Sequence, residues 1–236
     1  EWERLEPLKW GAIQDASRSF KEVTAIVDGW HPRHFGLLSE GALRALANIL
    51  NVIELLGIFP TTTQNLLVAI IEKDLGEHKP IGLFRALFRV WAKARQHVWA
   101  DWERRADPDH IFGAGANRGA TDIVWRQAFR NEVACASDEH AISVLIDLAK
   151  CYEHVRHIRL ALEAKCLNFP MVLLRITIRA YEWARKLTID KRVCSDLLPT
   201  RGIIAGCASA TTELKAFMYR SCSFTIARNP KVSTSI

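Results

Sequence analysis

The sequence has few of the features that mark membrane or secreted proteins. Charged residues interrupt every apolar run before it reaches the roughly 20 residues that a membrane-spanning helix needs, so no such helix is expected. The chain opens on EWERLEPLKW, which lacks both a starting Met and the apolar segment of a secretory signal. These absences predict an intracellular protein, in the nucleus or the cytoplasm, and a fragment of a longer chain.

Motifs of common catalytic and metal sites are also missing. None of the six cysteines forms a C-x-x-C pair, and their wide spacing favours reduced thiols over a disulfide framework. Cys151, His154 and His157 have no evident fourth ligand nearby, so an ordinary helix surface is favoured over a zinc site. The absence of G-x-S-x-G argues against a serine hydrolase. The absence of Lys-Ser or Lys-Thr after the glycines of FGAGANRGA argues against a P-loop.

The composition is that of an ordinary globular protein. Of 236 residues, 49% are hydrophobic and 25% are charged, which excludes a disordered chain and allows one large domain or two small ones. The net charge of +6 is compatible with a polyanionic partner such as nucleic acid, but it does not by itself identify one.

Hydrophobic periodicity predicts a helix and then a hairpin in the first third of the chain. The helix spans about 39–56, with Ser39 as its N-cap and Gly57 as its stop. Two apolar runs, QNLLVAIIEK and KPIGLF, flank the turn-like DLGEH. This pattern predicts a two-stranded hairpin with Lys73 and Lys79 near its tip.

The segment FRALFRVWAKARQHVWADW, residues 84–102, predicts one long amphipathic helix. Its shared, nearly all-apolar face consists of Phe84, Leu87, Phe88, Trp91, Arg95, Val98, Trp99 and Trp102. Arg85, Arg89 and Lys93 form a basic row on another face, where a solvated helix surface is favoured over a contact for nucleic-acid phosphates. Further elements are predicted as helices over 120–135, Pro170–Leu187 and the segment with Leu214, Phe217 and Met218, and as a strand over Val232–Ile236.

Asp147 ends a continuous apolar run, ISVLIDL, of the kind found in strands that are covered on both faces. Residues at helical spacing follow it, namely Cys151, Val155, Ile158 and Leu162. A buried carboxylate without a partner is costly. From position alone, Asp147 is equally well the N-cap acid of the following helix or a ligand for a metal or substrate at the exposed end of a strand.

Four segments, in this order along the chain, resemble motifs of reverse transcriptases. LLVAIIEKDLGEHKPIGLFRALFRVWAKAR resembles the fingers hairpin and its helix, and FGAGANRGATDIVWRQ the segment between fingers and palm. SVLIDLAKCYEHV is similar to motif A, in which an apolar strand leads to a metal-binding Asp and an aromatic residue follows five positions later. RGIIAGCASATTELK resembles motif B, a glycine-containing loop before a helix. The resemblance runs from about Asp28 to the end and is to enzymes of mobile elements rather than to retroviral ones.

The resemblance implies an α+β right-hand polymerase fold that is rich in helices. Residues 1–60 would form a helical N-terminal extension, 61–135 the fingers and 136–236 a partial palm. It also implies an RNA-directed DNA polymerase, a nucleotidyltransferase in which two Mg²⁺ ions assist phosphoryl transfer. The implied partners are an RNA template, a DNA primer and dNTPs, and no membrane.

The resemblance also implies roles for individual residues. Asp147 would bind Mg²⁺ with help from the backbone carbonyl of Leu148, because Mg²⁺ prefers oxygen ligands. Tyr152 would pack under the sugar of the incoming nucleotide, where a bulky ring excludes a 2′-hydroxyl and favours deoxynucleotides. Lys73 and Lys79 would contact the triphosphate as cations.

The glycine of motif B is Gly206, which would let the backbone approach the template base pair. The sequence departs from the family pattern in three ways. Lys79 replaces an Arg and loses its bidentate fork, and Ala205 replaces a Gln. The aromatic-x-Asp-Asp of motif C is absent, although NPKVSTSI resembles the strand that leads into it. We therefore expect the 236-residue chain by itself not to polymerise nucleotides.

Two other readings follow from the same residues. The chain is alternatively a non-catalytic nucleic-acid-binding relic of such a polymerase, which Ala205 and the absent motif C favour. It is alternatively a helical protein-interaction module whose Trp-rich faces dock a partner. An RNA-directed RNA polymerase is less expected, because these enzymes usually carry a second acid where this chain has Tyr152.

Overall fold

The structure is a computed structural model that describes residues 5–72, 78–106, 112–113, 119–140, 142, 148–189 and 192–228. The α-helices are α1 (Trp10–Arg18), α2 (Glu40–Leu56), α3 (Ala86–Ala94), α4 (Gln96–Ala106), α5 (Ala120–Ala136), α6 (Cys151–His154), α7 (His157–Cys166), α8 (Met171–Tyr181) and α9 (Ala210–Arg228), and the 3₁₀ helices are η1 (Pro32–Leu37) and η2 (Thr61–Thr63). The strands are β1 (Leu66–Glu72), β2 (His78–Leu83), β3 (Arg185–Ile189) and β4 (Arg192–Val193).

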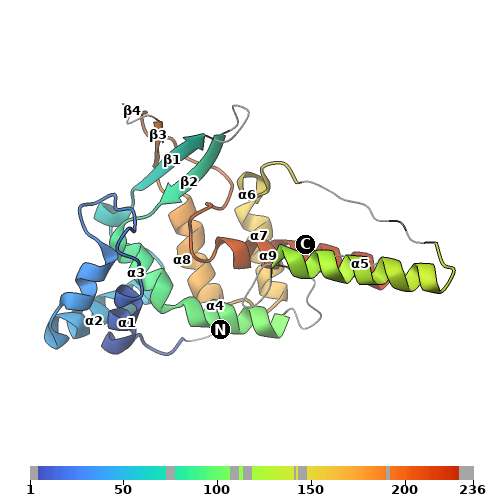
Figure 1. Cartoon of the computed structure of the whole chain (residues 1–236). Coiled ribbons are helices and arrows are strands. Elements are labelled where there is room, and N and C mark those ends of the chain that lie inside the picture. Colours follow the sequence, from blue (N-terminus) through green and yellow to red (C-terminus); the bar gives the residue numbers. More distant parts are fainter. Residues whose placement is uncertain are drawn as a thin grey trace.

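The fold is helix-rich and mixed, with a small sheet in the order β2-β1-β3-β4. β1 and β2 pair antiparallel, from Leu67 opposite Leu83 to Glu72 opposite His78, so the predicted hairpin is confirmed. β3 pairs parallel with β1 on its other side. The sheet lies at one end of the molecule, with most of the helices gathered on one side of it (Figure 1).

α2 begins and ends where its capping residues predict. The Ser39 hydroxyl accepts a hydrogen bond from the backbone N–H of Ala42, which satisfies one of the free donors at the start of the helix. Gly57 ends α2 in the left-handed conformation, with φ of 72°. Local sequence signals therefore suffice to place this helix.

The predicted long helix over 84–102 is wrong in one respect, because the structure has two helices that meet at Arg95. The backbone of Arg95 leaves the helical region, with φ of −91° and ψ of 0°. Trp99 and Trp102 in α4 are nevertheless buried, as are Phe88 and Trp91 in α3. The apolar periodicity continues across the break, which is why spacing alone does not reveal it.

The predicted helix over Pro170–Leu187 is too long. α8 ends at Tyr181, and the residues from Arg185 form β3 instead. β1 offers its free edge to this segment, and Leu66 pairs with Arg185. Pairing with a strand that is distant in the sequence overrides the local helical pattern here.

The helical stripe predicted through Cys151, Val155, Ile158 and Leu162 is also wrong. The backbone is extended at Val155, with ψ of 117°, and this residue separates α6 from α7. Ile158 is 80% exposed and Leu162 is 55% exposed. α7 instead buries a face that consists of His157, Leu160, Glu163 and Ala164. Two of these four side chains are polar, so a pattern of apolar residues cannot find this face.

One hydrophobic core joins residues from α1 to α9. Its centre is a group of five aromatic side chains, namely Phe59, Phe84, Phe88, Trp91 and Trp183. The core contains residues from each of the three expected ranges, 1–60, 61–135 and 136–236, and these domain boundaries stay a prediction.

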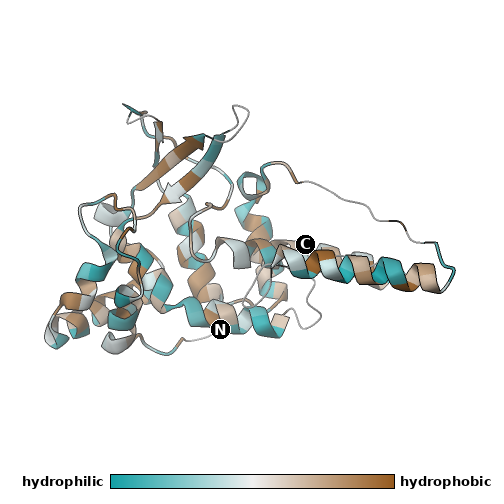
Figure 2. Ribbon diagram, viewed as in Figure 1, coloured by the Kyte–Doolittle hydropathy of each residue, from teal (hydrophilic) through white to brown (hydrophobic). Residues whose placement is uncertain are grey.

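α5 confirms the helix predicted over 120–135, and it extends away from the rest of the molecule (Figure 1). Its ribbon mixes hydrophobic and hydrophilic residues (Figure 2), and Trp125 and Phe129 are about 70% exposed. None of the described helices is both long and apolar enough to span a membrane. All six cysteines are free, as their spacing predicts.

Candidate functional site

A loop of residues 202–207, here called the glycine loop, lies against strand β2. The backbone N–H of Gly82 donates a hydrogen bond of 2.7 Å to the carbonyl of Ala205. Gly206 has φ of 107°, and a Cβ on it would lie 2.4 Å from the carbonyl oxygen of Gly82. A Cβ on Gly82 would in turn lie 2.1 Å from the side chain of Ile204. The glycines on both sides of this contact allow the two backbones to touch.

The other side of the glycine loop contacts α6. The N–H of Ile203 donates to the carbonyl of Tyr152 at 2.9 Å, and the N–H of Gly202 donates to the carbonyl of Val155 at 2.8 Å. The Tyr152 hydroxyl lies 3.3 Å from the Thr211 hydroxyl in the first turn of α9. The partly buried Tyr152 side chain is therefore fixed at both its backbone and its hydroxyl group.

The structure thus brings together three of the segments that the sequence singles out separately. The glycine loop joins the hairpin β1–β2 to α6, and Tyr152 and Gly206 lie on the two sides of this junction. Lys79 is exposed on β2, three residues from Gly82, which is about 10 Å along an extended strand. Leu148 is half-exposed, just before α6.

Two of the predicted site residues, Asp147 and Lys73, lie outside the described residues. Within the described part of the chain, no group of three or more His, Cys, Asp or Glu side chains is placed to hold a metal ion. The Mg²⁺ site therefore remains a prediction that rests on Asp147. His157, which the sequence analysis assigns to an ordinary helix surface, is instead buried, with 9% of its surface exposed.

Polar side chains to which no sequence motif assigns this role are buried beneath the glycine loop. His157 donates from Nε2 to the carbonyl oxygen of Gly202 at 2.9 Å, which fixes the loop to α7. The Tyr181 hydroxyl donates to Glu213 at 2.5 Å, and both side chains are fully buried. These residues fall within apolar helical patterns, and each partner comes from a different element, so no local signal identifies them.

Burial shifts the pKa values of this group. The pKa of Glu213 is raised, because burial disfavours the carboxylate more than the neighbouring hydroxyl groups and His157 favour it. Burial likewise raises the pKa of Cys207 to about 11 and holds the pKa of Tyr181 well above its usual value. The Cys207 thiol and the Tyr181 phenol therefore stay protonated at neutral pH.

Glu213→Gln is expected to flatten the dependence of folding stability on pH. Above the ordinary pKa of 4.5, the unfolded chain releases the Glu213 proton while the folded chain still holds it. The free energy of unfolding therefore falls as pH rises from 4.5 towards the raised pKa. The amide that replaces the carboxyl group cannot ionise and retains an acceptor for the Tyr181 hydroxyl. Urea unfolding over this pH range measures the difference in slope, with the exposed Glu40→Gln as the control. Parallel curves for the parent and Glu213→Gln would contradict the assignment.

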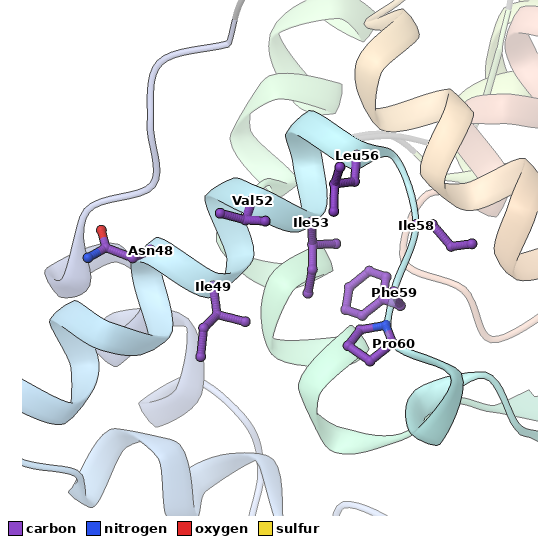
Figure 3. A pocket seen from close by; sticks show the side chains of 8 residues that line it. All are labelled: Asn48, Ile49, Val52, Ile53, Leu56, Ile58, Phe59 and Pro60. Atoms are coloured by element: carbon purple, nitrogen blue, oxygen red, sulfur yellow. The ribbon is translucent and has the colours of Figure 1, made fainter.

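An apolar groove of about 420 Å³ lies elsewhere on the molecule, along α2 and the segment that follows it (Figure 3). Its lining residues are Asn48, Ile49, Val52, Ile53, Leu56, Ile58, Phe59 and Pro60. None of them is titratable or nucleophilic, and none belongs to the glycine loop or its contacts. The groove therefore offers no chemistry to the candidate site.

Comparison with models of protein families and with curated proteins gives no match to this chain. The assignment of a function therefore depends on the motifs and on the way in which the fold brings them together.

Proposed function

We propose that the chain is the fingers and part of the palm of an RNA-directed DNA polymerase of the non-retroviral kind. The observation that carries this proposal is the junction of β2, the glycine loop and α6. These three segments lie far apart in the sequence, and each resembles a different reverse-transcriptase motif. Their contact through backbone hydrogen bonds is what a shared nucleotide site requires.

The geometry around Tyr152 suits the proposed selection of deoxynucleotides. A side chain that rejects a 2′-hydroxyl must not move aside when the ribonucleotide binds. Ile203 holds the backbone of Tyr152 and Thr211 contacts its hydroxyl group, so the ring is fixed at both ends. The aromatic face of Tyr152 would support the sugar. A 2′-hydroxyl placed against this face would lose its hydrogen bonds to water, and the carbon atoms of the ring offer no donor or acceptor in their place.

The remaining parts of the proposed chemistry come from charged residues. Mg²⁺ bound by Asp147 would neutralise charge that develops on the phosphates during in-line transfer. Lys79, and Lys73 at the predicted hairpin tip, would contribute positive charge to the triphosphate. Gly206 has a role within the protein as well, because its missing Cβ allows the loop to meet Gly82.

The second candidate function is nucleic-acid binding without catalysis. It is favoured by Ala205, whose methyl group replaces the family's Gln while its carbonyl remains hydrogen-bonded to Gly82. In that case the junction would survive as a structural support. A helical interaction module is the third candidate, and the exposed Trp125 and Phe129 of α5 favour it.

Binding of the 236-residue chain to a fluorescent RNA–DNA primer–template tests the proposal. Fluorescence anisotropy should show binding that weakens steeply as the salt concentration rises, because phosphate contacts release counterions. An unrelated basic protein of similar size and net charge serves as the control for non-specific binding. Absence of binding at low salt would contradict both the polymerase and the relic, and would leave the interaction module.

A further inference from the structure

A small pocket of about 160 Å³, with both apolar and polar lining residues, lies at the base of the sheet, apart from the glycine loop. It is lined by Val27, Asn65, Leu66, Leu67, Arg85 and Lys186. These residues come from the segment before η1, the start of β1, the residue before α3, and β3. In Figure 1 the blue segment between α1 and α2 lies beside this end of β1. Elements that are distant in the sequence therefore meet at one pocket, and two of its lining side chains, Arg85 and Lys186, are cationic.

The polar groups of this pocket have little to bind within the protein. Among the described residues, the guanidinium of Arg85 has no hydrogen bond or ion pair, and neither does the side-chain amide of Asn65. Lys186 has only a long pair of 3.7 Å with the half-exposed Asp196. The pocket thus presents the N–H donors of a guanidinium, an ammonium group and an amide to solvent.

The neighbouring Arg89 does have partners within the protein, so the lack of a partner among the described residues applies to Arg85 and is not shared by the whole basic row of α3. Arg89, one turn further along α3, donates to the carbonyl of Ala25 at 2.6 Å and lies over the ring of Phe20. Its pKa is lowered by burial, although the nearby Asp28 opposes this. Arg89 therefore serves the packing of the segment before η1, while Arg85 is left to face the pocket.

Two acidic side chains near the pocket, Asp28 and Asp196, make other contacts within the protein. Asp28 accepts hydrogen bonds from the backbone N–H groups of Ala86 and Trp30, so it caps the start of α3. Asp196 reaches only Lys186, at the long distance given above. Arg85, Arg89 and Lys186 carry three positive charges here, against the two negative charges of Asp28 and Asp196. This excess of positive charge favours an anion.

We propose that this pocket binds a phosphate group of a nucleic-acid backbone. A guanidinium fork and an ammonium group match the oxygen atoms of a phosphate, and the Asn65 amide adds a neutral donor. A backbone phosphate is favoured over a free one because Arg85 follows Gly82 by three residues, about 10 Å of extended chain. A strand that crosses the glycine-loop junction would continue across the pocket. The pocket itself requires no polymerase activity, so it would equally serve a non-catalytic binding protein.

Paired substitutions test the pocket in the 236-residue chain. Arg85→Gln with Lys186→Gln removes its two cations, and Lys9→Gln with Lys165→Gln removes two exposed cations elsewhere as the matched control. A fluorescein-labelled single-stranded oligonucleotide is titrated by anisotropy over a series of salt concentrations. Loss of one phosphate contact should reduce the salt slope by about 0.7, which corresponds to about fivefold weaker binding at 0.1 M salt. The control pair should change neither the salt slope nor the affinity by this amount.

Further measurements separate the possible results. Arg85→Lys keeps the charge and should lose less affinity than the paired variant, and far-UV circular dichroism should match the parent for every variant. Equal losses for the pocket pair and the control pair would overturn the proposal, and so would no loss for either. Inorganic phosphate could stabilise the parent but not the paired pocket variant, while both proteins bind the oligonucleotide equally well. That result would overturn the nucleic-acid assignment. None of these assays contains a free nucleoside triphosphate, so their outcome is independent of the selection proposed for Tyr152.

Discussion

Glu54→Gln is expected to lower the free energy of unfolding by about 3–5 kcal/mol. The Glu54 carboxylate accepts hydrogen bonds from Arg95 at 2.7 and 2.5 Å, and from the indole N–H of Trp91 at 2.8 Å. The side chains of Arg95 and Glu54 are only 4% and 8% exposed. A neutral amide at position 54 would leave the guanidinium of Arg95 buried without a counter-charge, and this accounts for the large effect.

Urea unfolding measures this loss, and Glu40→Gln in the same helix is the matched control. Glu40 pairs with Arg44 one turn away, but both side chains are more than half exposed. Such a pair contributes only about 0.3–0.5 kcal/mol. A loss for Glu54→Gln as small as that for the control would show that the buried pair does not hold α2 against the junction of α3 and α4.

Gly206→Ala is expected to detach the glycine loop from β2. The substitution places a Cβ at a φ of 107°, and that atom would meet the carbonyl of Gly82. Backbone strain of this kind costs about 1–3 kcal/mol, and loss of the hydrogen bond between Gly82 and Ala205 about 1 kcal/mol more. Hydrogen exchange at the Gly82 amide should become faster, because its acceptor would have moved away.

The matched control for this substitution is Gly41→Ala. Gly41 lies in the first turn of α2, and a Cβ on it would meet nothing within 4 Å. Alanine there should leave the stability unchanged or raise it by up to about 1 kcal/mol, because glycine is the poorer helix former. Unchanged exchange of the Gly82 amide in Gly206→Ala would contradict the close backbone contact that defines the candidate site.

The parts of the fold that the sequence predicts correctly have local signals. Ser39 and Gly57 mark the two ends of α2, and the turn between two apolar runs marks the hairpin. The break at Arg95 has no such signal, because its partner Glu54 is 41 residues away in the sequence. β3 lacks a local signal for a related reason: its strand conformation depends on the edge that β1 provides.

The candidate site shows the same division. Motif resemblance singles out Tyr152 and Gly206, and both lie at one junction in the structure. It gives no indication of His157, Tyr181 or Glu213, because buried polar networks depend on contacts between elements and not on spacing within one. The roles of Asp147 and Lys73 stay predictions, since both lie outside the described residues.

The preference of the chain for dNTP over rNTP tests the proposed function most directly. Competition between the two nucleotides is measured against a fluorescent dNTP in the presence of Mg²⁺ and a primer–template, for the parent, Tyr152→Phe and Tyr152→Ala. Tyr152→Phe loses the contact with Thr211 and should keep most of the preference, because the ring remains and Ile203 still holds its backbone. Tyr152→Ala should lower the preference for dNTP over rNTP by about tenfold or more. An equal preference in all three proteins, or none in the parent, would contradict a polymerase site built around Tyr152.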